Sequence, residues 1–342
     1  MATTPSKSLI SLYDDYANVS WDLIPVQETQ QHNQHTVKLN YPIHHHKNQL
    51  TQAVTSQLSD KNISPVNLVT EINRHQPQGL LQPLKKIKNI IAIHSNKGGV
   101  GKSTIATNIA ASLAQTGLNI GLLDGDLYGP NQPDLLGIDS RSAIDNDTYQ
   151  PISVHGITVM SMGFLVDQKT PLIWRGPMAS AYFQQMVFKT NWPHLDYLIL
   201  DCPPGTGDIL LTMAQKVPIS GVVLVCTPQC LSVKDSIKGI AMLEKMNIPI
   251  LGYIENMAGF ECSQCKHINH IFPENSLQQN LSPLNIDLFG KIPLDQRLIN
   301  STEKGIPHAH NQQDGLTHKI QKIATRICAK LATRPQAKPH IF

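Results

Sequence analysis

The sequence predicts an α/β protein in which a doubly wound, mostly parallel sheet follows a small N-terminal α+β domain. Three observations support this fold class. Short apolar runs recur after residue 88, segments with helical spacing separate them, and the chain before residue 85 has few apolar residues. Strands that are apolar throughout are buried on both faces of a sheet, and helices between such strands favour parallel pairing.

The first 85 residues predict the small domain. Residues 35–43 alternate like a strand, residues 47–60 have helical spacing, and residues 65–72 form a second strand-like run. His44–His46 fall between the first strand and the helix, and no further metal ligands surround them, which favours a polar turn over a metal site. Residues 73–88 contain Pro, Gly and clustered Lys, as is typical of a linker.

Six apolar runs predict the strands of the main domain, which we expect to cover residues 88–335, with residues 336–342 as a tail. Ligands of such sheets bind beyond the carboxyl ends of the strands, so the loops that follow the strands are where we expect the chemistry. The predicted strands are "NIIAIHS" (89–95), "LNIGLLD" (118–124), "ITVMSM" (157–162), "LDYLILD" (195–201), "GVVLVCT" (221–227) and "IPILGYIEN" (248–256).

The composition predicts a globular protein of the cytoplasm. Apolar residues make up 41% of the 342 residues, and the formal net charge of +3 is too small to favour a nucleic-acid or membrane partner. The N-terminus has no apolar core like that of a signal peptide, and no apolar run reaches the about 18 residues of a membrane span. Cysteines of cytosolic proteins stay mostly reduced, so we expect the six cysteines to be thiols or metal ligands.

The stretch "NKGGVGKST" nearly matches the phosphate-binding pattern G-x-x-x-x-G-K-[ST]. It lies between the first predicted strand and a predicted helix at residues 102–117 that ends with Gly117, which is the context such a loop requires. Asn96 replaces the first glycine, and we expect it to adopt the left-handed conformation that Asn enters at low cost. The predicted nucleotide-binding residues of the loop are Asn96, Lys97, Gly98, Gly99, Val100, Gly101, Lys102, Ser103 and Thr104.

The parts of this loop have separate tasks in binding ATP and Mg²⁺. Backbone N–H groups and the helix N-terminus would face the phosphates, Lys102 would bridge the outer phosphates, and the Ser103 hydroxyl would hold Mg²⁺. Taken alone, Lys97 is also consistent with a solvated lysine. The loop resembles that of the deviant Walker-A ATPases, whose signature is K-G-G-x-G-K-[ST]. This resemblance implies that Lys97 reaches the nucleotide of a second subunit, and hence that the protein is a homodimer.

Carboxylates stand at the ends of two predicted strands, where Asp124 and Asp126 follow one and Asp201 ends another. ATP hydrolysis needs a group that orients water and an acidic group for Mg²⁺. The resemblance implies that Asp126 lies in switch I and positions water, and that Asp201 is the Walker-B carboxylate that holds Mg²⁺ through water. For Asp124, a functional role and a loop-capping role both stay open. Asn256 matches the position where the family hydrogen-bonds adenine, and its amide offers a donor and an acceptor.

A second chemical signal is the C-x-x-C pair formed by Cys262 and Cys265 in a loop after a predicted strand. A redox disulfide would want a thioredoxin-like context, which is absent. A zinc site within one chain would add His267 and His270, at spacings that are cramped for zinc. Two cysteines from each of two subunits would give four thiolates around one [4Fe–4S] cluster, and the dimer implied by Lys97 favours this interpretation.

Taken together, residues 88–335 resemble the Mrp/ApbC family of iron–sulfur cluster carrier ATPases. The matching segments include "KGGVGKST", "DGDLYGPNQPDLLG", "LDYLILDCPPGTGD", "GYIENM" and "CSQC". The resemblance implies an ATP-dependent, homodimeric carrier or scaffold that passes its cluster to iron–sulfur apoproteins. The chain departs from the family at Cys230, where Asp is usual, and at "FPENS" (272–276), where a Gly-rich stretch is usual. We assign no mechanism to Arg175 of the matching "WRGPM" segment.

A different class of function rests on the C-terminal segment. Other deviant Walker-A ATPases position division or partition machinery on membranes or DNA, some of them through a basic amphipathic helix. Residues 316–334 have the pattern of such a helix. A helix packed on the sheet with its basic face in solvent is favoured, because a membrane helix gives no reason for the C-x-x-C pair. A cluster scaffold with negligible ATPase activity is a third interpretation.

Overall fold

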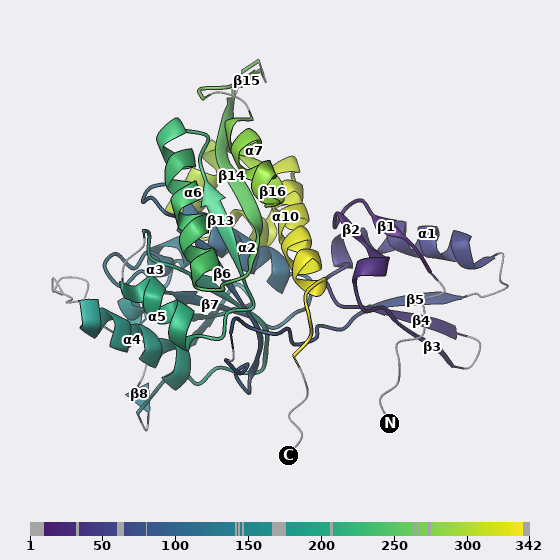
Figure 1. Ribbon diagram of the computed structural model, residues 1–342, viewed down its shortest axis with the longest axis horizontal. Helices are drawn as coiled ribbons and strands as arrows, with labels where there is room; N and C mark the ends of the chain where they lie inside the picture. The colour runs from purple at the N-terminus through teal and green to yellow at the C-terminus, as the bar shows by residue number, and fades with distance from the viewer. Residues whose placement is uncertain are drawn as a thin grey trace.

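The structure is a computed structural model that describes residues 10–31, 34–59, 65–79, 81–140, 142, 144–145, 147–165, 176–205, 208–262, 264–265, 267–272 and 275–337. The two main parts of the molecule are a small N-terminal sheet and a large sheet with helices on both sides (Figure 1). Within the described ranges, two further pairs of short strands form separate two-stranded sheets, β1 (Tyr13–Asp14) with β2 (Val19–Ser20) and β8 (Ile144–Asp145) with β9 (Thr148–Tyr149). The long C-terminal helix α10 (Gly315–Ala332) faces the N-terminal part, where the Arg326 side chain donates a hydrogen bond to the Tyr16 carbonyl (3.2 Å).

The N-terminal part confirms the predicted order of strand, helix and strand. In its described residues, a helix packs beside a three-stranded sheet whose middle strand pairs antiparallel with one neighbour and parallel with the other. His44–His46 form one 3₁₀ turn before the helix, as expected for a polar turn. The first strand of the sheet was not predicted, because its sequence "QETQQ" has no apolar residue. The elements are β1 (Tyr13–Asp14), β2 (Val19–Ser20), β3 (Gln27–Gln31), β4 (Gln34–Leu39), α1 (Lys47–Ser59) and β5 (Val66–Thr70).

The large sheet contains all six strands predicted for the main domain, and nine strands within the described part of the chain. Its strands are β6 (Ile87–His94), β7 (Ile120–Asp124), β10 (Ile152–Val154), β11 (Ile157–Met160), β12 (Leu195–Asp201), β13 (Gly221–Cys226), β14 (Ile250–Glu261), β15 (Ile268–Asn269) and β16 (Leu288–Leu294). The order is β10-β11-β7-β12-β6-β13-β14-β15, and β16 also pairs with β14. Only the short strands β10 and β15 pair antiparallel among these. The sheet is therefore mostly parallel, as predicted.

Side chains alternate between the two faces of this sheet, and each face has its own hydrophobic core. In β12, Tyr197 and Ile199 belong to the core that includes α2 and α10, whereas Leu198 and Leu200 belong to the core that includes α4, α5 and α6. Both faces are buried, which explains why the strands read as continuous apolar runs. The helices of this part are α2 (Lys102–Ala114), α3 (Gln132–Leu136), α4 (Gly176–Lys189), α5 (Asp208–Lys216), α6 (Cys230–Lys245), α7 (Ser276–Leu281), α8 (Gln296–Glu303), α9 (His308–Asn311) and α10.

The buried side chain of His75 contacts both the N-terminal part and the main part of the molecule. The His75 ring bonds Asn40 of the N-terminal part (3.0 Å) and Asn89 of β6 (3.0 Å). Burial lowers the pKa of His75 to about 4, so the ring is neutral. The backbone of His75 pairs with Gln336, so the first residues of the expected tail return to the expected linker.

Candidate functional site

The predicted phosphate loop runs from the end of β6 to the start of α2 and lines a cavity of about 370 Å³. Two of its glycines are required by their backbone, because Gly99 and Gly101 have φ of 78° and 83°. Gly101 also lies close to the Asn256 side chain, and a Cβ atom on this glycine would meet the Asn256 amide nitrogen at 2.4 Å. Lys97 lines the same cavity with an exposed side chain.

Asn96 does not take the left-handed conformation expected from the sequence, since it is not among the described residues with positive φ. Its side chain instead joins the start of the loop to helix α6. The Asn96 amide donates to the carbonyl oxygens of Asp235 and Ser236, and its oxygen bonds the His94 ring at 2.9 Å. Asn96 also packs against Gly239, where a Cβ atom would lie 1.8 Å from the Asn96 amide. The expectation was wrong because the residue at position 96 is not required for a left-handed backbone. It is required for its side chain, which contacts α6.

The structure brings together Lys102 and Asp201, which the sequence places 99 residues apart. Lys102 Nζ lies 2.5 Å from Asp201 Oδ1 and 3.3 Å from Ser103 Oγ. The Lys102 side chain is only 6% exposed and the Asp201 side chain only 1%. Burial on its own would lower the pKa of Lys102, but the Asp201 carboxylate raises it above its ordinary value. The hydroxyl of Ser103 and the carboxylate of Asp201 thus both contact the ammonium of Lys102.

The second carboxylate oxygen of Asp201 is held by Gln132, a residue that the sequence analysis missed. Gln132 Nε2 donates to Asp201 Oδ2 at 2.8 Å. Gln132 is the first residue of α3 and is fully buried. A polar residue directly after the "DGDLYGPN" segment is a weak signal in the sequence, because nothing in it indicates that the side chain turns inward.

Asp124 and Asp126 have different environments. Asp124 is 1% exposed and accepts hydrogen bonds from the backbone N–H groups of Asp126 (3.2 Å) and Gln132 (3.1 Å) and from the Ser161 hydroxyl (2.9 Å). These bonds tie both ends of the loop after β7 to one carboxylate, so Asp124 organises the loop. Burial, together with the charge of Asp201, raises the pKa of Asp124 to about 7.

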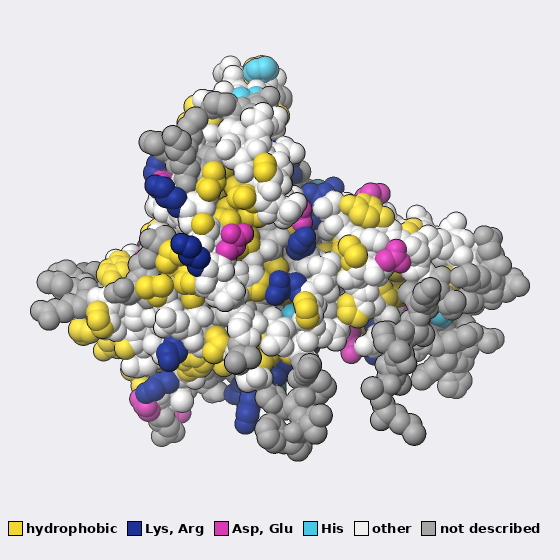
Figure 2. Space-filling view, in the orientation of Figure 1, with side chains coloured by type: hydrophobic (Ala, Val, Ile, Leu, Met, Phe, Trp, Pro, Cys, Tyr) yellow, Lys and Arg dark blue, Asp and Glu magenta, His cyan; other side chains and the backbone are white. Residues whose placement is uncertain are grey.

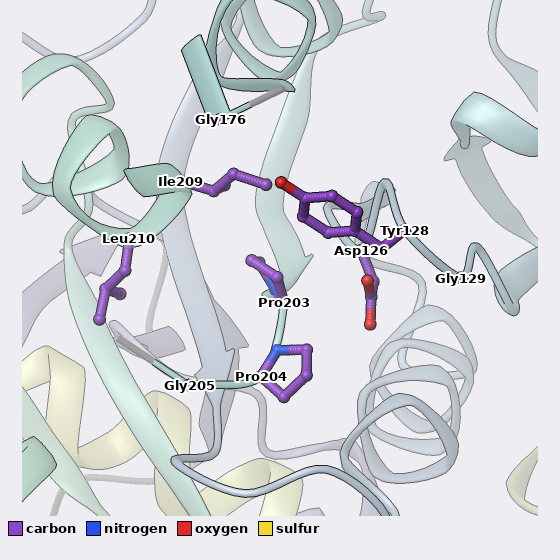
Figure 3. A pocket seen from close by; sticks show the side chains of 9 residues that line it. All are labelled: Asp126, Tyr128, Gly129, Gly176, Pro203, Pro204, Gly205, Ile209 and Leu210. Atoms are coloured by element: carbon purple, nitrogen blue, oxygen red, sulfur yellow. The ribbon is translucent and has the colours of Figure 1, made fainter. Parts of the chain in front are cut away.

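Asp126 lies at the boundary between two cavities. It lines the phosphate-loop cavity and a neighbouring cavity of about 690 Å³. In the larger cavity, the Tyr128 ring points across the opening toward Ile209, and Pro203 and Pro204 form the floor (Figure 3). Burial raises the pKa of Asp126, while the charge of Lys102 opposes this shift. A carboxylate at this place can accept a proton from, or orient, a water molecule beside a bound phosphate.

Asn256 adjoins the loop from β14. Its amide nitrogen donates to the Val100 carbonyl oxygen at 2.8 Å, which leaves its second N–H and its oxygen for other partners. Asn256 also lines a small cavity of about 100 Å³, which shares Gly101, Thr104 and Thr302 with the phosphate-loop cavity. Apart from Asp295, its other lining residues are apolar: Met257, Pro293, Leu294, Leu298 and Ile299.

The C-x-x-C pair lies at the end of the same strand. Cys262 directly follows Glu261, the last residue of β14, and its N–H donates to the His267 carbonyl oxygen at 2.9 Å. The hairpin of β14 and β15 projects from the sheet, and histidine side chains gather at its tip (Figures 1 and 2). Cys262 is half-buried and Cys265 is exposed.

The potential metal ligands of this hairpin do not form a metal site within the part of one chain that the structure describes. Among the residues that the structure describes, no group of three or more His, Cys, Asp or Glu side chains is arranged to hold a metal ion. The single-chain zinc set of Cys262, Cys265, His267 and His270 is therefore not assembled in the described chain. The cysteines Cys202, Cys226 and Cys328 are buried, as expected for core residues, and burial raises the pKa of each thiol. Arg175 and the Cys230 side chain lie outside the described part of the structure.

The apolar face of α10 is covered by the chain itself. Ile320, Ile323, Ile327 and Leu331 are at most 2% exposed, and the helix packs on α2 and β16. The observed packing is the one favoured from the sequence, with a helix on the sheet rather than a free amphipathic face. No helix within the described ranges is long and apolar enough to cross a membrane.

The chain is similar in sequence to several known proteins. A family model described as "ParA: NUBPL iron-transfer P-loop NTPase" matches residues 86–331. An iron-sulfur cluster carrier protein of Pseudomonas fragi is 44% identical over 263 residues, which cover 76% of this chain and 92% of that protein. The iron-sulfur cluster carrier protein of Escherichia coli K12 is 42% identical, over 74% of this chain and 69% of its own. The iron-sulfur cluster transfer protein NUBPL of Dictyostelium discoideum is 41% identical, over 75% and 80%.

Solved structures show the same fold. A nucleotide-binding protein from Archaeoglobus fulgidus, solved in complex with ADP, is 34% identical with a TM-score of 0.59, and the match covers 67% of this chain and 91% of that one. The septum site-determining protein MinD of Pyrococcus horikoshii has a TM-score of 0.53 at 21% identity, over 69% and 94% of the two chains. At 21% identity, the similarity to MinD shows a common fold and nothing further.

Proposed function

The chain belongs to the family of iron-transfer P-loop NTPases, and from this membership we propose that it is an ATPase that carries a [4Fe–4S] cluster between two copies of itself and delivers it to iron–sulfur apoproteins. One observation carries the proposal. Strand β14 holds Asn256 against the phosphate loop and ends directly before Cys262, so one element connects the nucleotide pocket to the thiols.

For the nucleotide, the backbone N–H groups of residues 98–104 and the ammonium of Lys102 would bind the phosphates. The small cavity beside Asn256 would take the adenine ring, because half of its lining residues are apolar and the Asn256 amide has a donor and an acceptor available. The relative from Archaeoglobus fulgidus, which was solved in complex with ADP, supports nucleotide binding by this chain.

Mg²⁺ fits the residues that surround Lys102. Mg²⁺ prefers oxygen ligands and keeps several of its waters, so the Ser103 hydroxyl and the Asp201 carboxylate suffice on the protein side. Both oxygens already converge on the Lys102 ammonium, at 3.3 and 2.5 Å. Bound there, the ion would neutralise charge on the phosphates. Asp126 would orient the attacking water, and Lys97 would reach the nucleotide of the second subunit.

The cluster is the cargo of this protein. A [4Fe–4S] cluster needs four thiolates, and each chain offers Cys262 and Cys265 at the tip of a projecting hairpin. Two copies related by a two-fold axis would complete the set. The exposure of Cys265 suits a cluster that must be handed to another protein.

Anaerobic reconstitution with iron and sulfide tests this proposal. Cys262→Ser and Cys265→Ser should each abolish bound iron and sulfide while leaving nucleotide affinity unchanged. Cys226→Ala, a change at a buried thiol of β13, is the matched control and should retain the cluster. A full cluster in Cys262→Ser, or one zinc ion per wild-type chain in place of iron, would contradict the ligand assignment.

A further inference from the structure

Every polar group of the Gln132 side chain has a partner in the interior of the nucleotide site. The Gln132 amide nitrogen donates to Asp201 Oδ2 (2.8 Å) and to the Ser103 carbonyl oxygen (3.3 Å). Its oxygen accepts a hydrogen bond from the Thr107 hydroxyl at 2.6 Å. The side chain therefore connects the strand that ends with Asp201 to the helix that begins with Lys102 and Ser103.

The backbone of Gln132 is fixed as well. Its N–H donates to Asp124 Oδ2 at 3.1 Å, and Asp124 is itself buried at the end of β7. If the amide side chain rotated away, Asp201 Oδ2 would lose this donor and the polar atoms of Gln132 would lose their partners in a buried region. Gln132 is thus held from both its backbone and its side chain.

We propose that Gln132 is a positioning residue that fixes Asp201 relative to Ser103 and thereby sets the affinity of the nucleotide complex for Mg²⁺. This inference rests on the proposed function, which assigns the ion to these two residues. Mg²⁺ demands nearly ideal octahedral geometry, so a shift of one oxygen-bearing group lowers its affinity. A group that orients a metal-binding residue typically affects metal affinity by about 10–100-fold.

The contacts explain why an amide is needed at position 132. Lys102 holds one oxygen of Asp201, and a phosphate in the loop would compete for that ammonium. Gln132 holds the other oxygen without neutralising it, so Asp201 keeps its orientation and its charge when Lys102 changes partner. A carboxylate at position 132 would repel Asp201 and Asp124, and a leucine would fill a similar volume without donating a hydrogen bond.

The test separates affinity for Mg²⁺ from affinity for the nucleotide. Binding of fluorescent ADP is measured first in EDTA and then at increasing Mg²⁺, for wild type, Gln132→Leu, Gln132→Glu and Thr107→Val. We expect the affinity in EDTA to stay within about twofold of wild type in Gln132→Leu, and the half-saturating Mg²⁺ concentration to rise by about 10–100-fold. Thr107→Val removes the hydroxyl that lies 2.6 Å from the Gln132 side-chain oxygen and 2.8 Å from the Ser103 carbonyl oxygen, and should shift the half-saturating concentration in the same direction by less. Gln184→Leu, at an amide that bonds within α4, is the control and should titrate like wild type.

The outcomes distinguish a failure of the role assigned to Gln132 from a failure of the proposed function. An unchanged Mg²⁺ titration in folded Gln132→Leu would overturn this inference and leave the proposed function standing. The same holds if Gln132→Leu loses as much nucleotide affinity in EDTA as in Mg²⁺, because such a loss marks a merely structural role. If Gln132→Leu does not fold, Thr107→Val gives the answer by the same measurement. A wild-type protein that binds no nucleotide under either condition would instead defeat the proposed function, and this inference with it.

Discussion

The ammonium of Lys102 lies 2.5 Å from a carboxylate oxygen of Asp201, and both side chains are almost completely buried. The pair joins the helix of the phosphate loop to the strand that carries the acidic residue of the site. In the proposed function, a phosphate that enters the loop would compete with this carboxylate for the Lys102 ammonium. Lys102 would then have one partner without the nucleotide and another with it.

Breaking this pair should destabilise the fold. Removing one partner of a buried pair leaves an uncompensated charge and typically costs about 3–5 kcal/mol. We expect Lys102→Met and Asp201→Asn each to lower the free energy of unfolding by about 3 kcal/mol, and the double variant to lose less than the sum. Urea unfolding of the four proteins checks this. Additive losses would show that the two residues do not interact in solution.

Lys97 should matter for activity and not for stability, because its side chain is exposed. Lys97→Ala should keep its unfolding free energy within about 0.5 kcal/mol of wild type and still bind nucleotide, but lose ATP turnover. Lys102→Ala should also lose turnover. In a mixed dimer, however, one site combines an intact Lys102 with the partner's intact Lys97. Mixing the two inactive variants should therefore restore part of the steady-state rate, and a mixture that stays inactive would contradict a lysine that acts across the dimer.

Met257 is strained between the nucleotide pocket and the thiols. It has φ of 56° inside β14, and the pairing of β14 with β16 shifts register between Asn256 and Phe260. A non-glycine residue in this region of backbone conformation is costly. We infer that a displacement of Asn256 would reach Cys262 through this strained position. Met257→Gly should keep the cluster and bind nucleotide, but bring the ratio of cluster-transfer rates with and without ATP close to one. Transfer of the cluster to an apo-ferredoxin measures this ratio. A ratio unchanged from wild type would exclude a coupling role for the strained backbone at Met257.

Acid should destabilise the protein through its buried neutral histidines. Burial lowers the pKa of His75 and of His94 to about 4, from an ordinary value of 6.5. The unfolded chain takes up protons below pH 6.5 while the folded chain does not, so the stabilisation is complete above that pH and declines as pH falls toward 4. Each group contributes a slope of at most about 1.4 kcal/mol per pH unit.

Asp124 opposes this trend, because its raised pKa of about 7 favours the folded state as pH falls. The comparison of wild type with His75→Gln isolates the histidine. Urea unfolding at several pH values between 7.5 and 4.5 should give a smaller loss of stability on acidification in His75→Gln than in wild type. Identical pH dependence in the two proteins would show that folding does not lower the pKa of His75.

The sequence was sufficient for the framework of the sheet, because strands buried on both faces must be apolar along their length. It was not sufficient for β16, whose "LFGKIPL" contains a glycine, a lysine and a proline. It also placed the end of β14 at residue 256, five residues before the observed end at Glu261, because the strand continues past the bulge at Met257.

The placement of the loop between β6 and α2, and of Asp124 and Asp201 at strand ends, was predictable because these residue types and spacings are typical of phosphate sites. The role of Gln132 was not, because its contact with Asp201 joins residues 69 positions apart and depends on the inward direction of one side chain. Asn96 illustrates the same limit, since its partners lie in α6, about 140 positions further along the chain. Sequence patterns identify local conformation, whereas these contacts exist only in the folded protein.

The mass of the cluster-bearing species tests the central claim most directly. Native mass spectrometry of the anaerobically reconstituted protein should show one [4Fe–4S] cluster on a species of two 37.8-kDa chains. The Cys262→Ser variant should show no cluster on any species. A cluster, or a zinc ion in its place, on a single chain would contradict the account, because the thiols of one chain would then be sufficient.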